Sequence, residues 1–263
     1  MGYTSPMSAP AAVALPRRQS RVPVFFERNW RLFAEIAFIA PAYLAYQFVR
    51  GIVGGQGGTA FDNAYRLIHV EKQLGIFHEA FLQQLILPKG WMVDVFNYVY
   101  IWGHLPVIIA VAFWLYFRHQ GNYALFRNAF LLSGLIALIG FSTVPLAPPR
   151  YMPEFGFTDT IIHAQSYYAF QNPKIVNQYA AMPSLHFGWD LLVAVAIFVN
   201  MQGRGWKVFA MWLPFVTLGG IVLTANHYFL DAAAGAAVAA CGLGVAFLLR
   251  KSVARDRFFS FLT

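Results

Sequence analysis

Hydrophobic positions dominate the chain in long runs, separated by short polar stretches. Six of these runs are long enough to cross about 30 Å of hydrocarbon as a helix. They are Leu32–Val49, Trp91–Phe117, Ala124–Leu146, Pro183–Met201, Val208–Ala225 and His227–Leu249. The last two runs are almost continuous, which predicts a tight hairpin. We therefore predict an all-α, polytopic membrane protein with six transmembrane helices.

Two shorter stretches between the first and second runs keep helical spacing but are too short to span a membrane. Their apolar positions are Phe61, Tyr65 and Ile68, followed beyond Gly75 by Phe77, Phe81 and Leu85. Charged side chains fill other positions, at Arg66, Glu71, Lys72 and Glu79. After a flexible link at residues 51–58, we expect two short helices lying at the outer membrane interface.

The composition supports a membrane protein and argues against a nucleic-acid partner. The chain has 263 residues, of which 59% are hydrophobic and 11% are charged, whereas a soluble domain carries about 25% charged residues. Its net charge of +8 comes from basic residues placed between the apolar runs instead of gathered in one patch. Such placement is typical of charges that set membrane topology.

The basic residues also predict an orientation. If the N-terminus is cytoplasmic, thirteen of the nineteen Lys and Arg residues fall on the inner side, as the positive-inside rule requires. We expect a multi-pass protein of the cell (inner) membrane with both termini in the cytoplasm. Its predicted parts are a basic tail and juxtamembrane segment at 1–31, a six-span domain at 32–250, and a short basic cytoplasmic tail at 251–263.

Three motifs lie at the ends of hydrophobic runs and, in this orientation, at the same outer edge of the membrane. They are LAPPR ending at Arg150, MPSLH ending at His186, and HYFLD from His227 to Asp231. Ionisable groups are costly at that depth and are functional candidates by default. The three motifs therefore predict a site on the outer, periplasmic or luminal face.

The residue types in these motifs suit phosphoryl transfer. Asp231 lies one helical turn after His227, where it can orient one ring nitrogen and leave the other as a nucleophile or base. His186, as an imidazolium, can protonate a leaving oxygen. Ser184 opens a helix, where backbone N–H groups attract phosphate, and Arg150 offers a charged fork to phosphate oxygens. These parts form a phosphohistidine without requiring a metal or cofactor.

Each residue also has a purely structural interpretation. His227 and Asp231 form a plausible buried pair between helices, Ser184 a plain helix start, and Arg150 an interfacial anchor. Zinc ligation finds no support, because the chain has neither a His-Glu-x-x-His motif nor a cysteine pair.

Four further ionisable residues lie within or near the predicted spans: Glu35, Asp94, His104 and Asp190. Interfacial solvation explains Asp94, which lies near the outer end of its span. His104 is a candidate to face the cavity, and Asp190 is a candidate to orient His186 or to hydrogen-bond a polar head group.

The loop from Ala147 to Met182 is unusually long and rich in proline and aromatic residues. An aromatic belt at the membrane interface and a roof over a site that admits lipid from the side both explain this composition. Asp159 is placed to cap a short helix through Phe170.

The motifs APPR, MPSLH and HYFLD, in this order among six apolar runs, resemble the signature of the type 2 phosphatidic acid phosphatase superfamily. The resemblance covers roughly residues 60–250 and is nearest to the branch of inositol phosphorylceramide synthases and related phosphotransferases. Phosphatases of the superfamily carry a lysine where this chain has Thr143, and a Ser-Arg pair where it has Gly220 and Ile221. The absence of these two cations fits the synthase branch, which handles a less charged phosphodiester.

The resemblance implies that His227 is the nucleophile, Asp231 its orienting partner and His186 the general acid. It also implies that Arg150 and Ser184 bind phosphate, and that the enzyme acts without a metal on lipid phosphates or phosphodiesters.

We therefore expect an enzyme that moves a phosphoryl head group from a phospholipid to an alcohol acceptor, either a lipid or a polyol. With water as the acceptor, the same site makes a lipid phosphate or polyprenyl pyrophosphate phosphatase. A transporter or lipid-binding protein that uses the His/Asp pair as a proton relay is a third alternative. The chain shows no inverted repeat or interrupted span near the midplane to support it.

Overall fold

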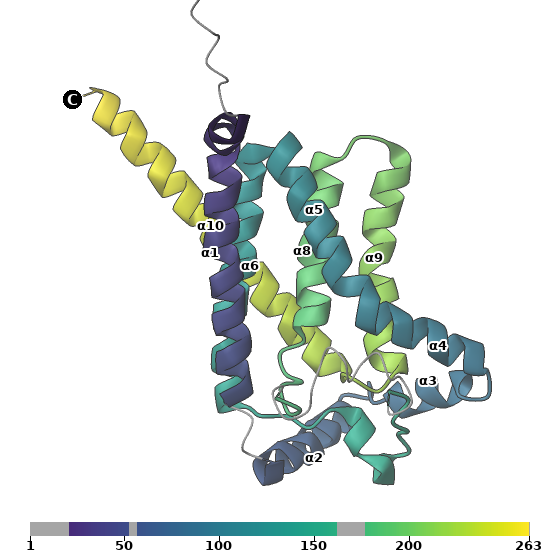
Figure 1. Cartoon of the computed structure of the whole chain (residues 1–263). Helices are drawn as coiled ribbons and strands as arrows, with labels where there is room; N and C mark the ends of the chain where they lie inside the picture. Colours follow the sequence, from purple (N-terminus) through teal and green to yellow (C-terminus); the bar gives the residue numbers. More distant parts are fainter. Residues whose placement is uncertain (1–20, 53–56, 162–176, 263) are drawn as a thin grey trace, which may run out of the picture. The chain divides into compact units, whose positions relative to one another are not determined.

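The computed structural model describes residues 21–52, 57–161 and 177–262, which form helices joined by turns and short loops (Figure 1). The chain divides into two compact units, Met1–Ala42 and Tyr43–Thr263. The described part of the first unit is the beginning of helix α1 (Arg21–Ile52). The second unit begins inside α1 and contains every other helix of the described segments, and the site lies within it.

The six apolar runs and the two short stretches all form helices. The short stretches are α2 (Gly57–Gln73) and α3 (Glu79–Ile86). The second run is α4 (Gly90–Tyr98), a π-helical turn η1 (Val99–Gly103) and α5 (His104–Arg118). The remaining runs are α6 (Gln120–Thr143), α8 (Leu185–Asn200), α9 (Arg204–Leu223) and α10 (Phe229–Leu262). Two single 3₁₀ turns, η2 (Pro149–Tyr151) and η3 (Pro153–Phe155), follow α6.

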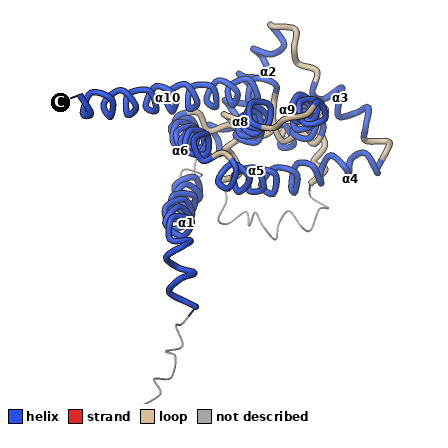
Figure 2. Tube along the Cα trace, turned by 90° about the horizontal axis from the view of Figure 1, so that it is seen from above, coloured by secondary structure: helices blue, strands red, loops and turns tan. Residues whose placement is uncertain are grey.

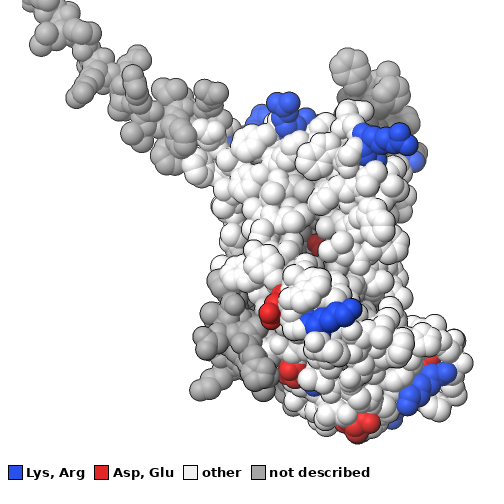
Figure 3. Space-filling view, turned by 90° about the vertical axis from the view of Figure 1, so that its right-hand side faces the viewer, with Lys and Arg blue, Asp and Glu red and all other residues white. Residues whose placement is uncertain are grey.

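The prediction of an all-α, polytopic membrane protein is confirmed. Within the described segments, five helices are long and apolar enough to cross a membrane, at Asn29–Gly51, Gly90–Arg118, Gln120–Thr143, Arg204–Leu223 and Phe229–Ser252. The apolar helix α8 has 16 residues and falls short of that length, so the sixth span stays a prediction. On the face shown in Figure 3, charged side chains gather toward two ends, with few between them.

Three expected boundaries differ from the helices observed. Helix α1 begins at Arg21 and α10 continues to Leu262, so the boundaries expected near residues 31 and 250 fall inside helices. The link expected at 51–58 is helical at both described ends. Hydropathy marks where a helix meets hydrocarbon but not where it begins, because charged residues continue a helix as readily as apolar ones. The helix expected through Phe170 lies outside the described residues.

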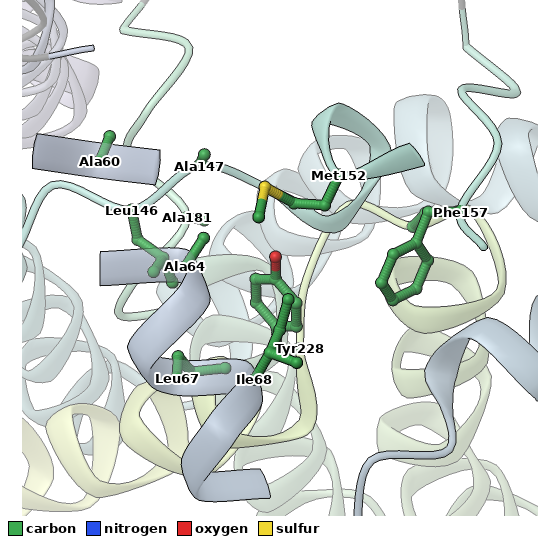
Figure 4. Close-up of a cluster of buried hydrophobic side chains, with 11 residues drawn as sticks. Ala60, Ala64, Leu67, Ile68, Leu146, Ala147, Met152, Phe157, Ala181 and Tyr228 are labelled. Atoms are coloured by element: carbon green, nitrogen blue, oxygen red, sulfur yellow. The ribbon is translucent and has the colours of Figure 1, made fainter. Parts of the chain in front are cut away.

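Helices α2 and α3 lie at the end of the second unit where α10 begins (Figure 1). A buried cluster joins α2 to this end: Ala60, Ala64, Leu67 and Ile68 pack with Leu146, Ala147, Met152, Phe157, Ala181, Ala225 and Tyr228 (Figure 4). The Tyr228 ring is fully buried at its centre. Burial of this cluster therefore connects the short helices to the residues that start α10.

Helix α10 runs obliquely across α6 and α8, which Figure 2 shows nearly end-on. Its contact with α8 is close because glycines face one another there. A Cβ added at Gly188 would collide with the Gly235 carbonyl oxygen, and one at Gly235 would collide with the Ser184 carbonyl oxygen. The Ser184 amide also donates a 3.0 Å hydrogen bond to the Asp231 carbonyl oxygen. Small residues at this crossing thus set the spacing of the MPSLH and HYFLD segments.

Replacing Gly235 with alanine should separate α8 from α10 and destabilise the protein by about 1–3 kcal/mol, as overpacking does. Gly244 on the same helix has nothing within 4 Å of an added Cβ, so Gly244→Ala should be neutral or slightly stabilising. Thermal unfolding in lipid nanodiscs measures both variants. Equal melting temperatures for the two would contradict this account of the α8–α10 contact.

Candidate active site

One cavity of about 300 Å³ brings the three sequence motifs together. Its walls come from the last turns of α1, the π-helical turn and α5, the end of α6, the start of α8, and the loops around residues 150, 178 and 226. Arg150, His186, His227 and His104 all line it. Of the other predicted site residues, Asp231, Ser184 and Asp190 are buried behind the wall and do not line the cavity.

His227 and Asp231 form the expected pair. The His227 Nδ1 atom lies 3.4 Å from Asp231 Oδ2, and both residues are buried. The same carboxylate oxygen accepts a 3.0 Å hydrogen bond from the Tyr228 amide. With Nδ1 donating to the carboxylate, the Nε2 atom of His227 carries the lone pair, which a nucleophile needs.

Three carboxylates cap the backbone amides that begin α10. Asp231 binds the Tyr228 amide, Glu79 Oε1 accepts from the Phe229 amide at 2.9 Å, and Glu71 Oε1 accepts from the Leu230 amide at 2.8 Å. Glu71 and Glu79 have no exposed surface. From their spacing we expected both residues on the polar face of interfacial helices. That expectation is wrong, because both are buried. Their carboxyl oxygens suit the unpaired N–H groups at the positive end of the α10 dipole.

Glu71 and Glu79 are close enough for each carboxyl group to influence the other. Burial and the neighbouring Glu79 carboxyl group raise the pKa of Glu71 from 4.5 to about 9. Glu71 therefore keeps its proton at neutral pH, while its Oε1 atom accepts from the Leu230 amide.

His186 lies in the first turn of α8, which Ser184 caps by accepting a hydrogen bond from the Phe187 amide at 3.5 Å. Its ring stacks on Tyr100, with 4.6 Å between ring centroids, and its centroid lies 5.9 Å from that of His227. The two histidines thus face the same cavity, His186 from the first turn of α8 and His227 from the segment just before α10. Tyr100, which sequence reasoning missed, fixes the plane of the His186 ring.

Asp190 pairs with His104 instead of His186. Its Oδ1 atom lies 2.8 Å from His104 Nδ1, and its Oδ2 atom accepts a 2.6 Å hydrogen bond from the Thr217 hydroxyl. The His104 ring lies 4.6 Å, centroid to centroid, from that of His186. Asp190 therefore acts on the site through His104. From spacing alone we expected His186 to be the partner of Asp190, because the two residues are one turn apart on the same helix.

The π-helical turn explains why His104 reaches the cavity. Pro106 has no amide to bond the Trp102 carbonyl oxygen, so one α-helical hydrogen bond is missing where the π-helical turn meets α5. The wider turn places Tyr100, Trp102 and His104 on the cavity wall. Such turns are frequent at functional sites.

Arg150 is held against the hairpin between α9 and α10. Its amide donates a 2.8 Å hydrogen bond to the Ala225 carbonyl oxygen, and its Nη1 atom donates to Asn226 Oδ1. Its guanidinium also lies over the Tyr151 ring, 4.8 Å from the centroid. These contacts keep a permanent positive charge beside His227.

Comparison with known proteins agrees with this geometry. The sequence model of a family described as the PAP2 superfamily matches residues 65–245, more than half of the chain. The chain belongs to the PAP2 superfamily. It is also 27% identical over 170 residues to a phosphoinositol dihydroceramide synthase of Bacteroides thetaiotaomicron. That match covers 58% of this chain and 55% of the relative, so the chain spans about half the relative's length. No solved structure matches the chain.

The structure shows where the two positions lie that carry a lysine and an arginine in phosphatases of the superfamily, Thr143 and Ile221 in this chain. The Thr143 hydroxyl is exposed and donates to the Ile139 carbonyl oxygen at 2.9 Å, and Ile221 is buried in the core. Neither position offers a cation to the cavity. A different cation, Arg50 of α1, lines it instead. Among the residues that the structure describes, no three His, Cys, Asp or Glu side chains form a group suited to a metal ion.

The Glu71–Glu79 pair predicts a pH-dependent stability. Between about pH 5 and pH 9 the folded protein keeps a proton that the unfolded chain releases, so its free energy of unfolding should fall as the pH rises. Glu71→Gln mimics the protonated acid and keeps an oxygen for the Leu230 amide, so it should flatten this dependence. At pH 5, where the raised pKa of Glu71 costs little, Glu71→Ala should lower stability by about 2 kcal/mol, because it leaves that buried amide unpaired.

Melting temperatures from pH 5 to pH 9 test these expectations. Glu79 and Asp231 are the charged groups nearest to Glu71, so Glu79→Gln is the matched variant for the other half of the pair. An unchanged slope in Glu71→Gln would show that Glu71 is already ionised in the folded protein.

Proposed function

We propose that the protein is a membrane lipid phosphotransferase that works through a phosphohistidine on His227. The observation that carries this proposal is the pair of histidines facing one cavity, His227 backed by Asp231 and His186 from a second helix. Arg150 supplies positive charge beside them. This arrangement provides a nucleophile, an acid and an anion-binding group at the same cavity.

In the first half of the reaction, His227 Nε2 attacks the phosphorus of a phospholipid phosphodiester. A P–N bond forms, and the P–O bond to the diacylglycerol oxygen breaks. His186, protonated beforehand, gives its proton to that oxygen. Asp231 stabilises the positive charge that the His227 ring gains, and Arg150 stabilises the charge on the phosphoryl oxygens.

In the second half, an alcohol replaces the diacylglycerol. The acceptor hydroxyl gives its proton to the now neutral His186, and its oxygen attacks the phosphorus as the P–N bond breaks. His227 returns to its starting form, and the head group with its phosphate is carried by the acceptor. Water entering in place of the alcohol would give hydrolysis by the same steps, so access to the phosphohistidine decides the outcome.

Two findings support transfer to an alcohol over hydrolysis. The relative from Bacteroides thetaiotaomicron is named as a synthase, whose product joins phosphoinositol to dihydroceramide. The cavity also lacks cations at the positions of Thr143 and Ile221, which fits a phosphodiester better than a monoester with its second negative charge. The predicted acceptor class is therefore a hydroxyl-bearing lipid or a polyol.

We also propose that the cavity opens on the outer side of the membrane and that both termini are cytoplasmic. The charge distribution supports this orientation. The α8–α9 loop, which precedes Arg204, lies at the opposite end of the bundle from the start of α10 (Figure 1).

Replacing His227 with alanine should lower transfer of a labelled head group by at least about a thousandfold, because the covalent intermediate cannot form. The assay uses purified protein in nanodiscs with a head-group-labelled glycerophospholipid, with and without an alcohol-bearing lipid. His69 is exposed on α2, so His69→Ala is the matched control and should retain full activity.

The products decide between the two enzyme classes. Label on the acceptor lipid, lost in His227→Ala, establishes the phosphotransferase. Label released only as phosphate or phosphorylated head group would make the protein a hydrolase. Retained transfer in His227→Ala would overturn the mechanism itself.

Orientation is tested with single cysteines in intact cells, in a Cys241→Ser background. Glu154→Cys, at an exposed position near the cavity, should react with a membrane-impermeant maleimide. Arg204→Cys should react only after the cells are opened. The reverse result would invert the proposed topology.

A further inference from the structure

The last turns of α1 form one wall of the cavity, although α1 lies outside the part of the chain that matches the family. Tyr43, Tyr46, Gln47 and Arg50 all line the cavity, and their spacing places them on one face of the helix. Leu44 and Phe48, on the other face, are 65% and 70% exposed. The helix therefore presents polar and aromatic side chains to the cavity and apolar ones away from it.

Arg50 presents a buried hydrogen-bond donor beside the cavity. Its Nε atom is buried and meets no acceptor among the residues that the structure describes. Its guanidinium lies 5.7 Å from the centroid of the Phe141 ring, which lines the same cavity. A charged side chain at the end of a span is costly to bury without a partner. An anion in the cavity would supply the missing acceptor.

Asn177, in the loop that lines the same cavity, also has a buried donor. This residue is 5% exposed, and its Oδ1 atom accepts a 2.8 Å hydrogen bond from the Tyr179 amide. Its Nδ2 atom is buried and has no acceptor in the described part of the chain. Two buried donors on different segments thus border one cavity, and neither has an acceptor within the described residues. Both call for ligand oxygens, because an unpaired buried donor is unfavourable.

The charged residues that line the cavity also indicate which class of ligand it binds. The Lys and Arg side chains among its described lining residues are Arg50 and Arg150, and no Asp or Glu is among them. A cationic head group would therefore meet two guanidinium groups and no carboxylate. A phosphodiester has two non-bridging oxygens, so one guanidinium can bind each of them.

We propose that Arg50, contributed by α1, is a second phosphate-binding cation in this cavity. This inference rests on the proposed phosphotransfer at the same cavity. Helix α1 then takes part in binding the substrate phosphate, whereas the histidines carry the chemistry.

The test of Arg50 compares Arg50→Gln with Arg50→Lys in the full chain in nanodiscs. Arg50→Gln should raise KM for the labelled phospholipid about tenfold or more, the loss expected for a hydrogen bond to a charged group. Arg50→Lys should recover part of the loss. Arg66 is exposed on α2, so Arg66→Gln is the matched control and should keep the normal KM. An unchanged KM in Arg50→Gln would overturn the assignment.

A second measurement does not depend on turnover. Inorganic phosphate should raise the melting temperature of the unmodified protein and of Arg66→Gln, because a ligand stabilises the folded state that binds it. Arg50→Gln should lose most of this shift while keeping its melting temperature without phosphate. A full shift in Arg50→Gln would overturn the role of Arg50, even if no phospholipid were turned over. Absence of turnover by the unmodified protein would contradict the proposed function instead.

Discussion

The start of α10 is the constraint on which the rest of the site depends. A helix that begins in the protein interior has N–H groups without intrahelical partners, and these groups must be paired. Here Asp231, Glu79 and Glu71 each accept from one amide of the first turn. The capping carboxylates come from α10, α3 and α2, so one set of hydrogen bonds joins three elements. His227 stands directly before this turn and is positioned by it.

The close crossing of α8 and α10 places His186 at the same cavity as His227. Gly188 and Gly235 let the two backbones approach, and the Ser184 amide bonds the Asp231 carbonyl oxygen. His186 therefore reaches the same cavity as His227 from another helix. Around them, Tyr100 stacks on His186, and His104 is held by Asp190 and Thr217. The two histidines thus have different partners, which suits the different roles proposed for them.

The sequence predicted much of the fold, because long apolar runs are a strong signal in a membrane protein. Each of the six runs contains a helix, and the two amphipathic stretches form α2 and α3. The burial of Glu71 and Glu79 was not predictable from spacing. A carboxylate that caps another helix has the same sequence pattern as one that faces water. The partner of Asp190 was missed for a similar reason: His104 is 86 residues away, whereas His186 is one turn away on the same helix.

By itself, the sequence determined the membrane class, the helical elements and the three motifs that identify the superfamily. Local spacing also paired His227 with Asp231, because residues four apart on a helix share a face. Only the tertiary structure decided that Arg50 and Asn177 border the cavity and that Glu71 and Glu79 bind the amides that begin α10. These contacts join segments far apart in the chain, and they depend on helix packing and on the pairing of buried polar groups.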